Sequence, residues 1–195
     1  MRSLILLLCA TTIVFSQTAP PAPVTPVHFK ELQKCLPKKG PAGFTAGKPK
    51  GQTMASTGFT TSTASIEFTA PKKEKQWQTL DDGKQDSVDV DVTWTVKTEI
   101  MDYAGLGEGM SAALKMVTDM QYENETEDGS EKSTSVNGMK GIEKIHSAEG
   151  SYSCSYRLVY GGRFLITMDG DGFSDTGILK AFVDAMDLKT LPTTK

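Results

Sequence analysis

The clearest periodicity in the chain is an alternation of apolar and polar residues over 87–100, SVDVDVTWTVKTEI. Val88, Val90, Val92, Trp94 and Val96 share one parity, and Asp89, Asp91, Thr93, Thr95 and Lys97 share the other. A two-residue period predicts a strand with one buried and one solvated face. A weaker alternation over 63–71, TASIEFTAP, predicts an earlier strand, and the pair Asp82-Gly83 indicates a turn between them.

Three other segments have apolar residues at helical spacing, which predicts amphipathic helices. They are 28–37 (HFKELQKCLP), 106–120 (LGEGMSAALKMVTDM) and 174–188 (SDTGILKAFVDAMDL). Pro37 ends the first, because proline cannot continue a helix.

The C-terminal half predicts a strand meander. Residues 139–147, 151–160 and 163–170 alternate, and Asn137-Gly138 and Gly161-Gly162 are hairpin-type pairs. Residues 38–58, rich in Gly, Lys and Pro, are expected to form a long surface loop. The predicted fold class is therefore α+β, an antiparallel β-sheet covered on one side by amphipathic helices, in the order α-β-β-α-β-β-β-α.

The N-terminal residues predict two segments that precede the folded domain. Residues 1–16 have a basic residue, an apolar run and small residues before a cleavage point, which predicts a secretory signal peptide. The apolar run is shorter than the roughly 20 residues of a membrane span, so no transmembrane segment is expected in the mature chain. Residues 17–26, QTAPPAPVTP, form a Pro-rich tether, and 27–195 a single α+β domain. The expected location is periplasmic or secreted.

The net charge of the chain argues against a nucleic-acid partner. The chain has 21 basic and 24 acidic residues, and loss of Arg2 with the signal peptide leaves 20 against 24. A mildly acidic protein is not expected to bind nucleic acid, because phosphate contacts need a basic surface.

Cysteine content leaves one question open. Of three cysteines, Cys9 leaves with the signal peptide, so Cys35 and Cys154 remain. In an oxidising compartment they can form one disulfide; the alternative is two buried free thiols.

The stretch ITMDGDGFSDTG, residues 166–177, is the main candidate for a metal site. Asp169, Asp171 and Asp175 could supply oxygen ligands, but reading frames from Asp169 or Asp171 lack the central glycine and terminal glutamate of an EF-hand. The favoured interpretation is a joint: Gly170 and Gly172 turn the chain, and Ser174 or Asp175 caps the next helix. No metal or cofactor is therefore predicted.

Other catalytic signals are weak. His28 and His146 have no metal-ligand spacing, and the methionines follow the helical stripe of 106–120. A Ser/His/Asp arrangement stays open, although no G-x-S-x-G elbow occurs.

Four segments carry a resemblance: FKELQKCLP, TSTASIEF, GMKGIEKI and GGRFLITMDGDGFSDTGILKAFVDAMDLKTL. With them the chain resembles a family of uncharacterised exported bacterial proteins. The predicted layout is also similar to the Mog1/PsbP-like sandwich, a likeness of topology that does not determine function.

The expected function is that of an exported, non-enzymatic accessory or binding domain of the cell envelope, whose partner is an envelope protein or a small ligand. Two alternatives remain: a carboxylate- or metal-dependent hydrolase, and a carrier of a small hydrophobic ligand, which would need an apolar cavity between helices and sheet.

Overall fold

The computed structural model describes residues 24–56, 59–80, 83–105, 107–148 and 150–192. The expected signal peptide and residues 17–23 of the tether lie outside these residues. Within the described ranges, no helix has the length and apolar character needed to cross a membrane.

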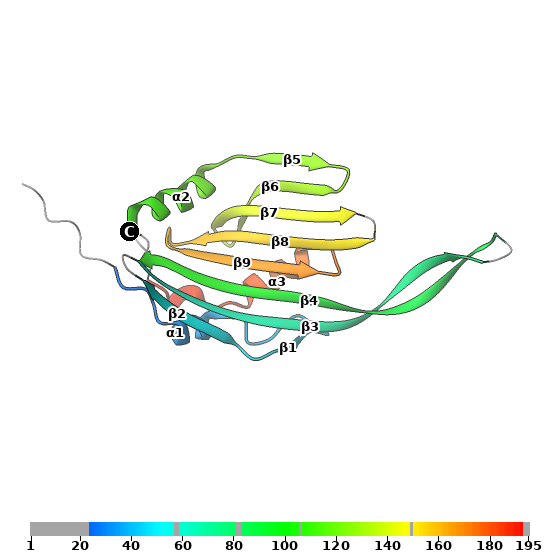
Figure 1. Cartoon of the computed structure of the whole chain (residues 1–195), viewed down its shortest axis with the longest axis horizontal. Coiled ribbons are helices and arrows are strands. Elements are labelled where there is room, and N and C mark those ends of the chain that lie inside the picture. Colours follow the sequence, from blue (N-terminus) through cyan, green and yellow to red (C-terminus); the bar gives the residue numbers. More distant parts are fainter. Residues whose placement is uncertain (1–23, 57–58, 81–82, 106, 149, 193–195) are drawn as a thin grey trace, which may run out of the picture.

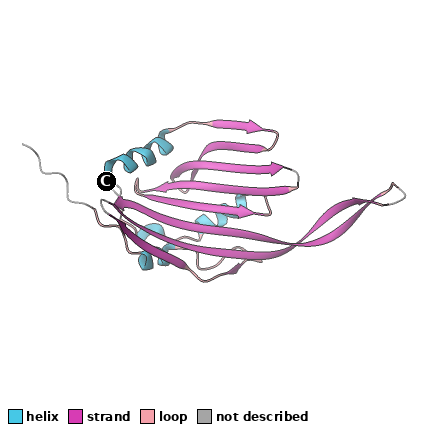
Figure 2. Cartoon of the chain, viewed as in Figure 1, coloured by secondary structure: helices cyan, strands magenta, loops and turns pink. Residues whose placement is uncertain are grey.

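A nine-stranded antiparallel sheet forms the body of the protein (Figures 1 and 2). Its strands follow the order β1-β3-β4-β9-β8-β7-β6-β5, and β2 also pairs with β3. The strands are β1 Thr45–Ala46, β2 Lys50–Ser56, β3 Phe59–Thr79, β4 Gln85–Gly105, β5 Glu123–Thr126, β6 Gly129–Val136, β7 Met139–Ala148, β8 Ser151–Tyr160 and β9 Phe164–Asp171.

The expectation of an α+β fold with a helix-covered sheet is wrong. Strand accounts for 57% of the structure and helix for 18%, so the fold is β-rich. The three α-helices were placed correctly along the chain, but they are short: α1 Phe29–Cys35, α2 Gly107–Asp119 and α3 Thr176–Asp184. The polar segments supply strands that were not expected, because 50–56 forms β2 and 123–136 forms β5 and β6.

The main core lies between one face of the sheet and helices α1 and α3. Phe68 of β3 and Phe182 of α3 are fully buried, with ring centroids 4.7 Å apart. Leu32 of α1 and Leu179 of α3 are also fully buried in this cluster. Burial of each such side chain is worth about 1.5–3 kcal/mol, which is why these short helices hold their places.

Helix α2 lies on the opposite face, so the helices do not all cover one side. It connects β4 to β5 across the sheet and contacts β4, β7 and β8. Leu114 of α2 and Val159 of β8 are buried there, outside the main core cluster. Successive strand residues point to opposite faces, so Val159 and the core residue Leu158 face different layers.

A buried ion pair joins β4 to the start of β9. Asp102 is fully buried, and the side chain of Arg163 is 9% exposed. The Arg163 guanidinium donates from Nε to Asp102 Oδ1 at 2.8 Å and from an Nη to Oδ2 at 2.7 Å. This two-point geometry is the strong form of an arginine–carboxylate contact.

The same carboxylate also anchors the beginning of the domain. The backbone N–H of Val27 donates to Asp102 Oδ2 at 2.7 Å, and that of Ala104 donates to Oδ1 at 2.9 Å. Arg163 donates in turn to the carbonyl of Thr25 at 3.1 Å. The end of the Pro-rich segment is therefore tied to the sheet immediately before α1.

We expect Asp102→Asn to lower the free energy of unfolding by about 3–5 kcal/mol, because it leaves the Arg163 charge buried without a counter-charge. Urea denaturation of the domain measures this loss. The control is Asp184→Asn, which breaks the exposed 2.9 Å pair with Lys180 and should cost less than about 1 kcal/mol. Equal losses for the two variants would contradict a structural role for the buried pair.

Candidate functional site

The three aspartates considered as metal-ligand candidates lie in different structural settings. Asp169 lies in β9 and pairs with Arg157 of β8 at 2.8 Å. Asp175 is the N-cap of α3 and accepts from the N–H of Gly177 at 2.8 Å. Asp171 is the last residue of β9. Among the described residues, no group of three or more His, Cys, Asp and Glu side chains is arranged to hold a metal ion.

The two glycines of this stretch act differently from each other. Gly172 has φ +88° and turns the chain out of β9, a conformation in which glycine avoids the cost borne by other residues. Gly170 lies within β9, so the expectation that it turns the chain is wrong. A Cβ there would lie 2.6 Å from the ring of Phe173, and the missing side chain makes room for that buried ring.

The two cysteines are free and buried. Cys35 lies in α1, with its Sγ 3.5 Å from Oγ1 of Thr190. Cys154 lies in β8. Burial raises the pKa of the Cys154 thiol to about 12, with smaller contributions from Asp175 and Glu143. Because the thiolate is the nucleophile, a thiol held neutral in this way is chemically inert.

A serine, a histidine and an aspartate do line up across the sheet, but in the wrong order for a triad. The register places Ser153 opposite His146 on one side and opposite Asp171 on the other, beside a hollow of about 290 Å³. A catalytic relay needs the histidine between the other two side chains. Within the described residues, no hydrogen bond joins these three side chains.

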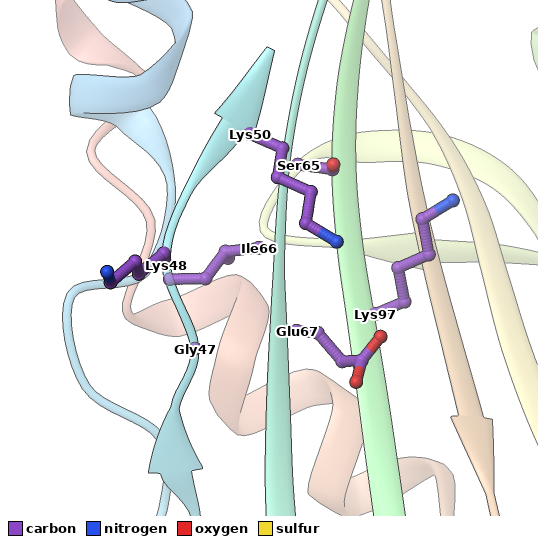
Figure 3. A pocket seen from close by; sticks show the side chains of 7 residues that line it. All are labelled: Gly47, Lys48, Lys50, Ser65, Ile66, Glu67 and Lys97. Carbon is purple, nitrogen blue, oxygen red and sulfur yellow. The ribbon is translucent and has the colours of Figure 1, made fainter.

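A second hollow, of about 340 Å³, lies where β1 ends and β2 begins along β3 (Figure 3). The N–H of Gly47 donates to the carbonyl of Glu67 at 2.7 Å, and the chain then leaves β3 until Lys50 pairs with Ser65. Lys50, Glu67 and Lys97 extend over the same side of the β3–β4 pair. This mixture of charges is typical of a solvated surface.

The most distinctive surface is the distal half of the β3–β4 hairpin, residues 71–79 and 85–93, which we call the arm. β1 reaches only Thr69 on one edge, and β9 reaches only Thr95 on the other. Beyond those points β3 and β4 pair, among the described residues, only with each other, and Figure 1 shows the ribbon twisting away from the other strands. At about 3.3 Å per residue, the arm projects about 30 Å.

The base of the arm is fixed to the core through Trp94. Its indole Nε1 donates to Glu74 at 2.9 Å, and Lys72 Nζ lies 4.8 Å from the ring centroid. The Trp94 ring also packs against Phe173, with centroids 5.1 Å apart. An isolated two-stranded ribbon is only marginally stable, so this anchor helps to hold the arm in a defined direction.

The rest of the arm exposes apolar side chains. Trp77 is 70% exposed, and Val88 is 41% exposed. The expectation that the valines of 87–100 form a buried face is therefore wrong in the arm, although Val96 in the body of the sheet is fully buried. The alternation correctly predicts a strand, but in the part of the chain that the structure describes no layer covers Val88 at its outer end.

Sequence reasoning missed the arm because residues 72–79 are Lys-, Glu- and Gln-rich and have low strand propensity. Their partner strand compensates, since Lys73 faces Asp91 and Lys75 faces Asp89 in the register. Opposite charges across a strand pair stabilise it. The opposite charges of the two segments were the signal from which their pairing could have been predicted.

The chain matches no protein-family model, no curated protein and no solved structure. The resemblance to exported bacterial proteins stays a prediction, and the functional argument rests on the geometry described above.

We expect the folded mature protein to leave 5,5′-dithiobis(2-nitrobenzoate) unreacted at pH 8, because both thiols are buried and protonated. After denaturation without reductant, Cys35 and Cys154 should both react. The Cys154→Ala variant should then release one thiol equivalent instead of two. A denatured wild-type protein that releases none would show that the two cysteines are bridged.

We expect Asp175→Ala to lower the free energy of unfolding by about 1 kcal/mol through loss of the α3 cap. Asp171→Asn is the matched control and should change it by less than about 0.5 kcal/mol. Millimolar calcium should leave the Tm of the wild type unchanged. A marked rise in Tm that Asp171→Asn abolishes would instead indicate a cation site, because a ligand that binds only the folded state stabilises it.

Proposed function

We propose that this protein is an exported, non-enzymatic binding domain that holds a partner protein in the bacterial envelope or outside the cell by means of the β3–β4 arm. The export part of the proposal rests on residues 1–26 of the sequence. The binding part rests on the arm.

The observation that carries the proposal is the exposed Trp77 on an arm that pairs with no further strand among the described residues. Large aromatic side chains contribute most to protein–protein binding when a partner covers them. In the free protein this ring contributes little to the core, and its exposure favours aggregation. A role in binding explains why an anchored ribbon presents it about 25 Å from the rest of the sheet.

The two alternative functions have less support. A carboxylate-dependent hydrolase would need Asp169, Asp171 and Asp175 to act together, yet Asp169 pairs with Arg157 and Asp175 caps α3. A hydrophobic carrier would need an apolar cavity between helices and sheet. That space is occupied by the packed rings of Phe44, Phe68 and Phe182.

The test begins with a photo-crosslinking amino acid, p-benzoylphenylalanine, in place of Trp77 in the exporting organism. The crosslinked protein is identified by mass spectrometry and purified. Its affinity is then measured for the wild type and for a shortened domain in which Asn-Gly replaces residues 73–91. Lys72 and Val92 face each other in register, so a two-residue turn can join them. We expect at least a tenfold loss of affinity.

Two point variants complete this test. Trp77→Ser should weaken binding by a similar factor, because it removes the exposed ring. Tyr122→Ser, at an exposed aromatic residue before β5, should leave binding within twofold of the wild type. Undiminished binding by the shortened domain, provided that it retains the wild-type urea midpoint to within experimental error, would refute the proposed role of the arm.

A further inference from the structure

The geometry points to a mode of recognition at the arm: we infer that the outer edge of β4 over Asp89–Val92 binds an extended segment of the partner by strand addition, and that this segment alternates basic with β-branched residues. This inference rests on the proposed function and specifies which edge of the arm is used. It is carried by the direction of the backbone groups, by a difference between the two edges and by charge.

The direction of the backbone groups follows from two hydrogen bonds. The carbonyl of Glu67 accepts from Gly47 and therefore points away from β4. At the far end, Leu80 N–H donates to the Lys84 carbonyl across the hairpin. The β3–β4 register is regular between these positions, and antiparallel backbone groups alternate between inward and outward. The odd-numbered residues of the arm therefore point their N–H and C=O groups outward.

This alternation leaves a row of free peptide groups on β4. Asp89 and Asp91 present theirs on the side where β9 would lie if it continued, but β9 ends at Asp171, opposite Thr95. The carbonyl of Thr93 points the same way, but Gly172, just after β9, lies beside it. Near the hairpin tip the row ends, because Ser87 N–H donates to Asp86 Oδ1 at 2.8 Å. An added strand would occupy the position between these limits.

The two edges of the arm differ in how well they resist strand addition. The β3 edge carries Pro71, which has no N–H to donate outward, followed by Lys73 and Lys75. Proline and lysine are the residues with which proteins protect exposed edges. Residues 85–93 of β4 contain neither, and they include valines at 88, 90 and 92, which favour strand pairing.

Charge and side-chain parity define the chemistry of the partner. Asp89 and Asp91 share one face of β4 with Thr93, and the three valines share the other. Residues of an added strand that lie beside the aspartates would be Lys or Arg, and those beside the valines would be β-branched. In β3, Lys75 lies opposite Asp89 and Lys73 lies opposite Asp91. A basic residue on the other side of each aspartate would continue this alternation of positive and negative charge across the strands.

The test uses two synthetic peptides, acetyl-TVKVKVT-amide as the probe and acetyl-TVEVEVT-amide as its acidic counterpart. Titration of the full mature domain is followed by the amide signals of Asp89 and Asp91 in two-dimensional NMR and by their hydrogen exchange. In the free protein both amides should exchange quickly, whereas Val90, which donates inward, should exchange slowly. We expect the basic peptide to slow exchange at Asp89 and Asp91 at least tenfold, and the acidic peptide to bind at least tenfold more weakly.

Proline substitutions distinguish the edges. Asp91→Pro removes an outward N–H and leaves the ladder to β3 intact, so it should weaken peptide binding at least tenfold. Asp91→Asn keeps that N–H and should weaken binding only about threefold. The matched control is Lys73→Pro, which blocks the other edge opposite Asp91 and should leave binding within twofold of the wild type. Asp89→Pro is a second edge variant, and urea midpoints confirm that each variant is folded.

The inference is overturned if the basic peptide does not protect these amides, if the acidic peptide binds equally well, or if Lys73→Pro weakens binding as much as Asp91→Pro. Sedimentation that shows a dimer of the free domain, dissociated by Asp91→Pro, would make a second copy the occupant and would also overturn it. If the shortened domain loses the purified partner while Asp91→Pro keeps it, only the strand-addition inference fails. Retention by both would refute the proposed function as well.

Discussion

The buried contact between Asp102 and Arg163 holds together three parts of the chain that are distant in sequence. One carboxylate receives the Arg163 fork from the start of β9 and the N–H of Val27 from the segment before α1. A buried carboxylate is tolerated only when its oxygens are satisfied, and here arginine and backbone donors meet that need together. The position of the first helix against β3, and with it one side of the core, depends on this contact.

The helices cover only part of the sheet. Helices of 7, 13 and 9 residues cannot cover nine strands, so the core is confined to the region under α1 and α3, with a smaller cluster under α2. The remaining sheet surface is polar and carries exposed pairs such as Arg157–Asp169, which contribute little to stability. Stability is therefore concentrated in the body of the sheet, and the arm contributes little to the core.

The arm shows how far a strand pattern can be extended without a covering layer. Val96 and Val88 belong to the same alternation, yet the first is fully buried and the second is 41% exposed. The difference arises because β9 and the helices end before the arm begins. A ribbon of this kind pairs well within itself, through valines and through lysines opposite aspartates, and its β4 edge keeps outward-pointing peptide groups at Asp89 and Asp91. These properties are the basis of the proposed binding of an extended polypeptide.

The local sequence pattern was sufficient to predict the elements that depend on residues close together in the chain. The helical stripes located α1, α2 and α3, the Asn137-Gly138 and Gly161-Gly162 pairs marked real turns with positive φ, and Asp175 was among the expected caps of α3. In contrast, β2, β5 and β6 were missed because they are polar on both faces. Such strands form because a neighbouring strand supplies hydrogen bonds, and no periodicity within 50–56 or 123–136 reveals that neighbour.

The sequence by itself determined where the helices lie, that the valine-rich segment is a strand, and that the aspartate-glycine stretch lacks the ligand pattern of a calcium loop. Only the tertiary structure decided that Asp102 is the buried partner of Arg163, that Asp169 is paired with Arg157, and that the valine strand leaves the body of the protein as an arm. The physical reason is that periodicity depends on residues a few positions apart, whereas burial, ion pairing and free edges depend on which distant strands end beside one another.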